Sequence, residues 1–167
     1  HKGDKRDLRF DIKKFNKFKE KIIYLTYDEM PSQIEKVFEN DSEDEKSRKF
    51  ILNAAYRESE QRNFISKGLK NAHDEDMILV SDVDEIPNLQ NLNFKKIKNE
   101  IIIFKQDMFY YKLNLKMPDM IWSGTKGCKK KKFINPQWIR NIKDKKYPFY
   151  RLDTFFSEKK YINIKFI

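Results

Sequence analysis

The 167-residue chain contains one cysteine and no long hydrophobic run, and these two absences exclude several classes of protein. The single cysteine, Cys128, excludes an internal disulfide framework and a multi-cysteine zinc site, and it favours a reducing compartment. No apolar segment approaches the ~20 residues that span a membrane. Aromatic residues make up 14% of the chain, which is too many for a disordered protein. We therefore expect residues 1–167 to form one folded domain.

The net charge of +10 is unevenly distributed along the chain. Between residues 126 and 146, nine Lys or Arg residues face one acid, whereas between residues 28 and 45 eight acids face one lysine. The basic run at residues 129–132 lacks the interleaved aromatic residues of a base-stacking surface. We therefore expect a solvated loop that attracts phosphate or an anionic membrane, and no specific nucleic-acid binding, through Lys129, Lys130, Lys131 and Lys132.

The order of apolar and polar segments predicts an α/β domain. Residues 46–70 have helical spacing and lack proline, and either Ser42 or Asp44 is placed to cap the start of this helix. A strand, this helix and then further strands indicate a layered domain with a mostly parallel sheet. The predicted strands are short runs of β-branched, aromatic or other apolar residues at 21–27, 77–81, 100–106 and 108–115.

Polar residues interrupt the apolar stripe of the predicted helix. At 100° per residue, the stripe consists of Ile51, Ala54, Ala55, Ile65 and Leu69. From the middle of the same stripe project three polar residues, Glu58, Gln61 and Arg62. The spacing of Glu58 and Arg62 predicts either an ion pair that flanks the core or a hydrogen-bonding group at the edge of a ligand pocket.

The segment "ILVSDVDEIP" at residues 78–87 places three carboxylates directly behind an apolar run. In an extended chain residues i and i+2 point the same way, so Asp82 and Asp84 can present oxygens to one point. Their mutual repulsion must be relieved by protonation or by a cation. Mg²⁺ or Mn²⁺ is an economical cation, because each binds through one or two carboxylates and completes its shell with water and substrate phosphates. The alternative is an N-cap cluster that opens a short helix at Asn88.

Two enzyme classes place an aspartate, a spacer and an aspartate after an apolar strand. In haloacid-dehalogenase-like phosphatases the first aspartate is a nucleophile and the second an acid or base. Here Ile86 stands where that class has Thr or Val, and no paired acids follow, so the phosphatase fits poorly. In nucleotide-sugar glycosyltransferases the pair anchors a metal ion on the donor diphosphate.

Further motifs accompany the acidic segment "SDVDEIP". It is preceded by "HKGDK" at the start of the chain, by "RESEQRN" at residues 57–63 and by Gly68-Leu69, and it is followed by "YYKLN" at 110–114 and "WSGTK" at 122–126. Together these motifs resemble glycosyltransferase family 17, which includes β-1,4-mannosyl-glycoprotein 4-β-N-acetylglucosaminyltransferase. The resemblance runs over most of the chain.

The resemblance implies a GT-A-like fold, a UDP-sugar donor, an Mn²⁺ or Mg²⁺ ion and an inverting transfer of a sugar, N-acetylglucosamine in that family, to a glycan hydroxyl. It implies that Asp84 contacts the metal ion directly and that Asp82 contacts it through water or binds the ribose. An inverting transfer also needs a general base, for which Asp119 and Glu85 are candidates. The remaining implied contacts are Asp82, Glu58, Gln61, Arg62 and Lys5 for the donor, and Trp122 and Tyr111 for the acceptor.

The family that the chain resembles carries two strands before the "HKGDK" position and a Gly-Trp-His-Phe segment after the position of Ile167. We therefore expect the domain to be truncated at both ends, poorly soluble by itself and weakly active. The competing hypothesis is a non-catalytic basic module that binds anionic surfaces. It is favoured by the net charge but not by the acidic segment.

Overall fold

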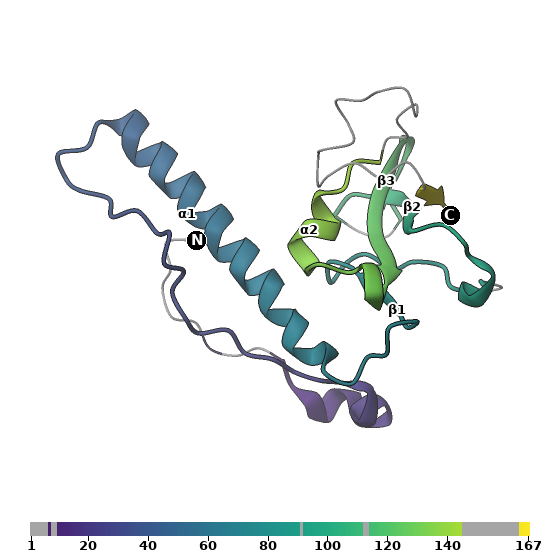
Figure 1. Cartoon of the computed structure of the whole chain (residues 1–167). Coiled ribbons are helices and arrows are strands. Elements are labelled where there is room, and N and C mark those ends of the chain that lie inside the picture. The colour runs from purple at the N-terminus through teal and green to yellow at the C-terminus, as the bar shows by residue number, and fades with distance from the viewer. Residues whose placement is uncertain (1–6, 8–9, 91, 112–113, 145–163) are drawn as a thin grey trace, which may run out of the picture. The chain divides into compact units, whose positions relative to one another are not determined.

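The computed structural model describes residues 7, 10–90, 92–111, 114–144 and 164–167, and it divides the chain into two compact units, 1–70 and 71–167 (Figure 1). Each unit is described separately. Among the described helices, none combines the length and the apolar character of a membrane span.

The first unit contains three helical segments. The 3₁₀ segment η1 spans Ile12–Lys21, the long helix α1 spans Glu43–Phe64, and the 3₁₀ segment η2 continues it over Ile65–Leu69. Ser42 caps α1 by accepting a hydrogen bond from the backbone N–H of Glu45 at 3.2 Å, and acidic residues in the first turn complement the helix dipole. The predicted helix at 46–70 is thus confirmed, and Ser42 is its cap.

Polar contacts, not an apolar stripe, hold α1 to the preceding loop. Asn53 is buried and exchanges two hydrogen bonds with the backbone of Glu35, at 2.9 and 2.8 Å. Lys49 is also buried and pairs with Asp41 at 2.8 Å. The predicted apolar stripe is wrong as a core, because Ile51 is 70% exposed and Ile65 is 55% exposed. The loop covers the polar face because that face supplies partners for its backbone.

The second unit is built on a four-stranded mixed sheet in the order β1-β3-β2-β4. Its strands are β1 (Met77–Val80), β2 (Ile101–Phe109), β3 (Lys116–Lys129) and β4 (Ile164–Phe166). β3 runs antiparallel to both β1 and β2, and only β2 and β4 are parallel. The α/β class is confirmed, but the prediction of a mostly parallel sheet is wrong. The cause is β3, which hydrogen-bonds between its two neighbours in the opposite direction.

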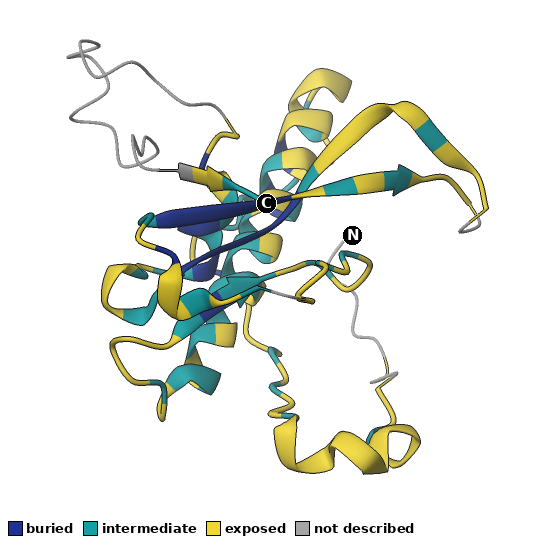
Figure 2. Ribbon diagram, turned by 90° about the vertical axis from the view of Figure 1, so that its right-hand side faces the viewer, coloured by how far each residue is buried: buried dark blue, intermediate teal, exposed yellow. Residues whose placement is uncertain are grey.

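The first four residues of β2 are all buried, and this part of the strand is dark blue in Figure 2. On one face Ile101 and Ile103 pack with Cys128 and with Trp138 and Ile139 of helix α2 (Pro136–Asn141). The other face carries a second cluster, built from Ile97, Ile102 and Phe104 with Leu92 and Phe94 of the segment that precedes β2. Two 3₁₀ turns, η3 (Phe94–Lys96) and η4 (Lys130–Lys132), flank these elements. Burial on both faces explains why this part of β2 is a continuous run of isoleucine.

Of the four predicted strands, two are wrong and two are confirmed. Residues 22–27 form no strand in the described structure, and Lys21 ends η1. The strand predicted at 108–115 contributes only its first two residues to β2, and Tyr110 begins the connection to β3, closed by a hydrogen bond from the Tyr110 N–H to the carbonyl of Leu115 at 3.0 Å. The strand at 77–81 is confirmed as β1, and the strand at 100–106 is confirmed as the first part of β2.

Candidate functional site

The acidic segment folds into a tight turn directly after β1. The backbone N–H of Glu85 donates to the carbonyl of Asp82 at 3.1 Å, and the backbone N–H of Asp82 donates to the Glu85 carboxylate at 3.0 Å. These two bonds close residues 82–85 into one loop, which we call the acidic turn. Asp84 lies exposed on it and forms no hydrogen bond or ion pair with any residue that the structure describes. The alternative helix at Asn88 does not form.

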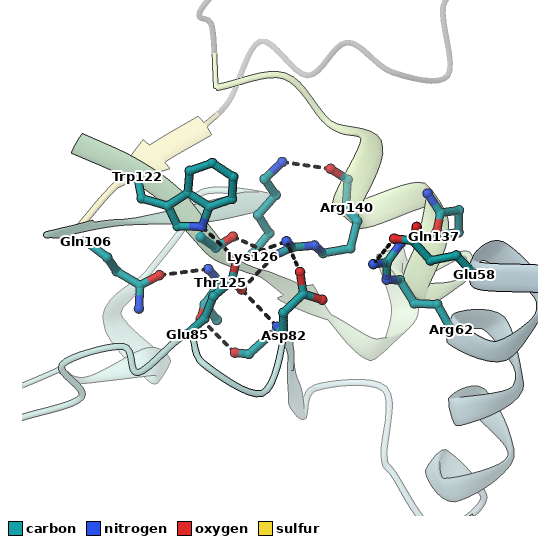
Figure 3. Close-up of polar contacts among 12 residues, drawn as sticks. Glu58, Arg62, Asp82, Glu85, Gln106, Trp122, Thr125, Lys126, Gln137 and Arg140 are labelled. Carbon is teal, nitrogen blue, oxygen red and sulfur yellow. Dashed lines mark hydrogen bonds and ion pairs between the residues drawn. The ribbon is translucent and has the colours of Figure 1, made fainter. Parts of the chain in front are cut away.

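Arg140 of α2 reaches across to the acidic turn and provides its counter-charge (Figure 3). Its guanidinium donates to both oxygens of Glu85, at 2.7 and 2.9 Å, to Asp82 at 2.8 Å and to the carbonyl of Gly124 at 2.9 Å. The side chain of Arg140 is 11% exposed and that of Glu85 is 5% exposed, whereas Asp82 is 43% exposed. Part of the positive charge that the sequence predicts beside these carboxylates is therefore supplied by Arg140, a residue of the same chain.

Local sequence explains why α2 presents Arg140 at this point. Asn135 caps the helix by accepting from the backbone N–H of Trp138 at 2.7 Å, and Pro136 occupies the first turn, where no N–H is needed. Trp138 and Ile139 are buried against the sheet and fix the rotation of the helix. Arg140 follows these anchors directly, and its side chain hydrogen-bonds to the acidic turn.

Glu85 is ionised despite its burial. Burial raises the pKa of a carboxyl, but hydrogen bonds from Arg140 and Trp122 and from the backbone N–H of Asp82 outweigh burial and lower the pKa of Glu85 below its ordinary value. The indole N–H of Trp122 donates to Glu85 at 2.8 Å. A buried carboxylate with this many donors acts as a fixed structural centre for the turn.

Every residue of the segment "WSGTK" at 122–126 of β3 forms a hydrogen bond outside the segment. Trp122 binds Glu85, and the hydroxyl of Thr125 shares a 2.6 Å hydrogen bond with that of Ser81 at the end of β1. The hydroxyl of Ser123 donates to Asp144 at 2.6 Å, and Lys105 donates to both, at 2.7 and 2.9 Å. The two motifs that are about forty positions apart in sequence therefore interlock in space.

A register shift between β2 and β3 explains the glycine in this segment. The regular ladder is interrupted between Ile103 and Lys105, opposite Gly124 and Thr125. The side chain of Gln106 lies over Gly124 and accepts from the backbone N–H of Thr125 at 3.2 Å. A Cβ on Gly124 would lie 1.7 Å from the Gln106 side-chain oxygen, so only glycine leaves room for this bond.

Lys126 binds the C-terminal end of α2. Its ammonium donates to the carbonyls of Arg140 and Ile142 at 2.8 and 2.6 Å, which satisfies the C-terminal end of α2. Burial, together with the nearby positive charge of Arg140, lowers the pKa of Lys126 to about 8. Lys126 therefore carries a positional role for α2, and through α2 for Arg140.

The structure brings together some of the residues predicted from sequence and separates others. Asp82, Glu85 and Trp122 lie in one hydrogen-bonded group, with Asp84 on the same turn. Asp119 is exposed in β3 and Tyr111 lies at the end of the β2–β3 ribbon with a positive φ of 53°. Within the described structure, neither Asp119 nor Tyr111 forms a hydrogen bond with the acidic turn.

The other predicted donor residues lie in the first unit or outside the described residues. Glu58 and Arg62 form the expected i, i+4 ion pair at 2.6 Å. Gln61 is exposed on the same helix, and Lys5, with the whole "HKGDK" segment, lies outside the described residues.

The residues of the acidic turn fit a hard divalent cation of the kind that keeps much of its water. Among the described residues, no group of three or more His, Cys, Asp or Glu side chains is arranged to enclose a metal ion. Mg²⁺ and Mn²⁺ need only one or two carboxylates when substrate phosphates complete the shell. The sequence predicts that Asp82 and Asp84 provide these from an extended chain, but Asp84 lies in a turn, so the shared ion stays a prediction. The turn keeps a net negative charge after Arg140 is counted.

The basic run is partly neutralised by acids of the same unit. Lys129 pairs with Glu75 at 2.5 Å, Lys131 pairs with the other oxygen of Glu75, and Lys132 pairs with Glu100 at 3.2 Å. The two lysine hydrogen bonds lower the pKa of Glu75 to about 2. This pairing reduces the charge that the run presents to an anionic surface.

Sequence reasoning missed Arg140, Gln106 and Lys126. The signal for Arg140 was its position in "PQWIRNI", where a single arginine stands among residues typical of a buried helix face. Comparisons with protein-family models, with curated proteins and with solved structures found no match for this chain.

Proposed function

We propose that this chain is a metal-dependent, inverting glycosyltransferase that moves a sugar from a UDP-sugar to a glycan hydroxyl. The acidic turn is its donor site, with the GT-A-like arrangement of an acidic pair behind a strand. The proposed sugar is N-acetylglucosamine, as in glycosyltransferase family 17, which the motifs resemble. A nucleotide diphosphate and a divalent ion both suit a turn that is exposed, acidic and flanked by a guanidinium.

One observation carries the proposal. Two of the motifs that carry the resemblance, "SDVDEIP" and "WSGTK", are joined by direct hydrogen bonds, one between the hydroxyls of Ser81 and Thr125 and one from Trp122 to Glu85. Segments that only filled the core would not need a buried carboxylate to hold an exposed turn in one conformation. Pre-organised acidic residues at a strand end are what a donor site requires.

Each residue of the turn has a separate proposed role. Asp84 and Asp82 would hold the metal ion, which when bound neutralises the departing nucleoside diphosphate. Glu85 positions the turn, because its carboxylate oxygens already accept from Arg140, Trp122 and the backbone of Asp82. Such a carboxylate is a poor general base, which leaves Asp119 as the proposed base.

Trp122 is the proposed acceptor contact. Its indole N–H is held by Glu85, and the residue remains 42% exposed. A ring fixed at one edge and open to solvent offers an apolar face for a sugar ring, at little cost in side-chain entropy. Tyr111 is proposed as a more distant acceptor contact at the end of the ribbon.

The test uses the full-length protein that contains residues 1–167, because these residues alone are expected to be weakly active, and its Asp84→Asn variant. Isothermal titration of UDP should show binding that requires Mn²⁺, and Asp84→Asn should abolish both this binding and the turnover of UDP-N-acetylglucosamine without changing the unfolding curve. The matched control is Asp74→Asn, an exposed aspartate before the other end of β1. Binding of UDP that is equal with and without Mn²⁺, or unaltered in Asp84→Asn, would remove the proposal.

A further inference from the structure

The segment η1 of the first unit combines lysines with aromatic residues that it does not bury. Over Ile12–Lys21 it contains five lysines and one acid, and none of its residues is buried. Phe15 and Phe18 are 44% and 50% exposed. The segment is purple in Figure 1, and it is yellow over almost its whole length in Figure 2. Its apolar side chains therefore have no core to enter within the described structure.

The apolar surface extends beyond the two ends of η1. Phe10 stacks on Phe15 with ring centres 5.4 Å apart, and on Tyr24 with ring centres 4.7 Å apart. Phe10 and Tyr24 are themselves partly open to solvent, and Ile23 beside them is 67% exposed. We call residues 10–24 the basic aromatic segment.

The backbone of η1 is interrupted. Phe15 has φ −118° and ψ 25°, outside the helical region, and a 3₁₀ run of ten residues is itself uncommon. As one continuous α-helix, the same residues would separate by chemistry. At 100° per residue, Ile12, Phe15, Phe18 and Ile22 would cover about one third of the circumference, opposite four of the five lysines.

The lysines of η1 keep their positive charge available to an external anion. None of them forms an ion pair with a residue that the structure describes. In the basic run at 129–132, by contrast, three of the four lysines pair with Glu75 or Glu100. The run that sequence reasoning assigned to an anionic membrane is thus partly neutralised, whereas η1 is not.

Charge and exposed aromatic rings together indicate which partner fits the basic aromatic segment. A second copy of the chain would cover the rings, but it would bring lysines against lysines in a protein of net charge +10. A bilayer with anionic lipids satisfies both features. Its headgroups attract lysines, and the boundary between headgroups and acyl chains accommodates aromatic rings.

We propose that the basic aromatic segment is a membrane-surface anchor, which docks this protein onto bilayers that contain anionic lipids. On the bilayer the segment forms one continuous helix parallel to the surface. Phe15 and Phe18 enter the interface, and the lysines contact lipid phosphates and carboxylates. The anchor is independent of the proposed transferase activity.

The test measures sedimentation of the full-length protein with vesicles of phosphatidylcholine that contain about 20% phosphatidylserine. Affinity should fall about tenfold in the double variant Lys13→Gln with Lys17→Gln, and about fivefold in Phe18→Ser. Vesicles of phosphatidylcholine alone, or added salt, should also weaken binding. The matched controls remove the same chemistry from exposed positions elsewhere in the first unit, in Lys36→Gln with Lys70→Gln and in Phe50→Ser, and should bind like the unmodified protein.

A further variant reports insertion directly and guards against misfolding. Phe18→Trp should keep the full affinity, and its added tryptophan emission should shift to shorter wavelength when anionic vesicles are present. The anchor is refuted if the unmodified protein does not sediment with these vesicles, or if the tryptophan emission does not shift. It is also refuted if Lys130→Gln with Lys132→Gln weakens binding while the η1 variants do not. A dimer in solution that Phe18→Ser dissociates would assign the rings to a second copy and overturn the proposal.

Discussion

Replacing Arg140 with methionine should lower the free energy of unfolding by about 3 kcal/mol at pH 7. Methionine keeps much of the buried stem, so the loss comes from the four hydrogen bonds of the guanidinium. The bond to Asp82 lies at the surface and contributes at most about 1 kcal/mol. The main cost is Glu85, which is 5% exposed and would keep only the indole of Trp122 and one backbone N–H as donors.

The assay is urea unfolding followed by tryptophan fluorescence, with the midpoint and slope fitted together. The double variant Glu85→Gln with Arg140→Met should recover most of the loss, because an ion pair removed as a unit leaves no buried charge. The exposed substitution Lys143→Met should change the free energy of unfolding by less than about 0.5 kcal/mol.

The pH dependence gives a second measurement on the same variant. The pKa of Glu85 is lowered in the folded chain from its ordinary value of 4.5, so its contribution to stability is present above pH 4.5 and is lost as the pH falls through the folded pKa. In Arg140→Met this contribution is absent, and the difference between the two proteins should shrink below pH 4.5. A loss smaller than about 1 kcal/mol at pH 7, or a difference that is constant from acid to neutral pH, would refute the reasoning.

Two further predictions concern β3. Gly124→Ala should lower the free energy of unfolding by about 1–3 kcal/mol, because the new Cβ displaces Gln106 and leaves the N–H of Thr125 without a partner. In a Gln106→Ala background the same substitution should cost much less, and additive losses in urea unfolding would contradict this. The pKa of Lys126 is about 8 in the folded chain against an ordinary 10.5, so the free energy of unfolding of the unmodified chain, relative to that of Lys126→Met, should rise as the pH increases from 8 to 10.5. A difference in urea unfolding that is constant over this pH range would contradict this prediction.

The elements that sequence reasoning found were those determined locally. The cap at Ser42 depends on residues within one helical turn, and β1 is a short apolar run after polar residues. The acidic segment was predicted to be a candidate site because carboxylates at i and i+2 must meet a counter-charge. The source of that charge, however, is 58 positions away from Asp82, and no local pattern relates the two residues.

The direction of the sheet was misjudged for the same reason. The residues of β3 include proline, two glycines and several lysines, which are poor strand formers, so the segment does not read as a strand. Its strand conformation comes from pairing on both sides, with β1 and with β2. The apolar residues Ile51 and Ile65 were assigned to a core because periodicity records spacing along the helix and not which face the chain later covers.

Because each of the five consecutive residues 122–126 forms a hydrogen bond outside the segment, the number of residues in β3 matters more for these hydrogen bonds than the amino-acid composition of the strand does. Side chains alternate between the two faces of a strand, so one residue inserted after Ser123 would turn Thr125 and Lys126 away from Ser81 and α2 together. An insertion between the ends of β2 and β3 would leave these contacts unchanged. Among descendants of one ancestral gene, we therefore expect insertions and deletions to accumulate at the end of the ribbon and to be absent from residues 122–126.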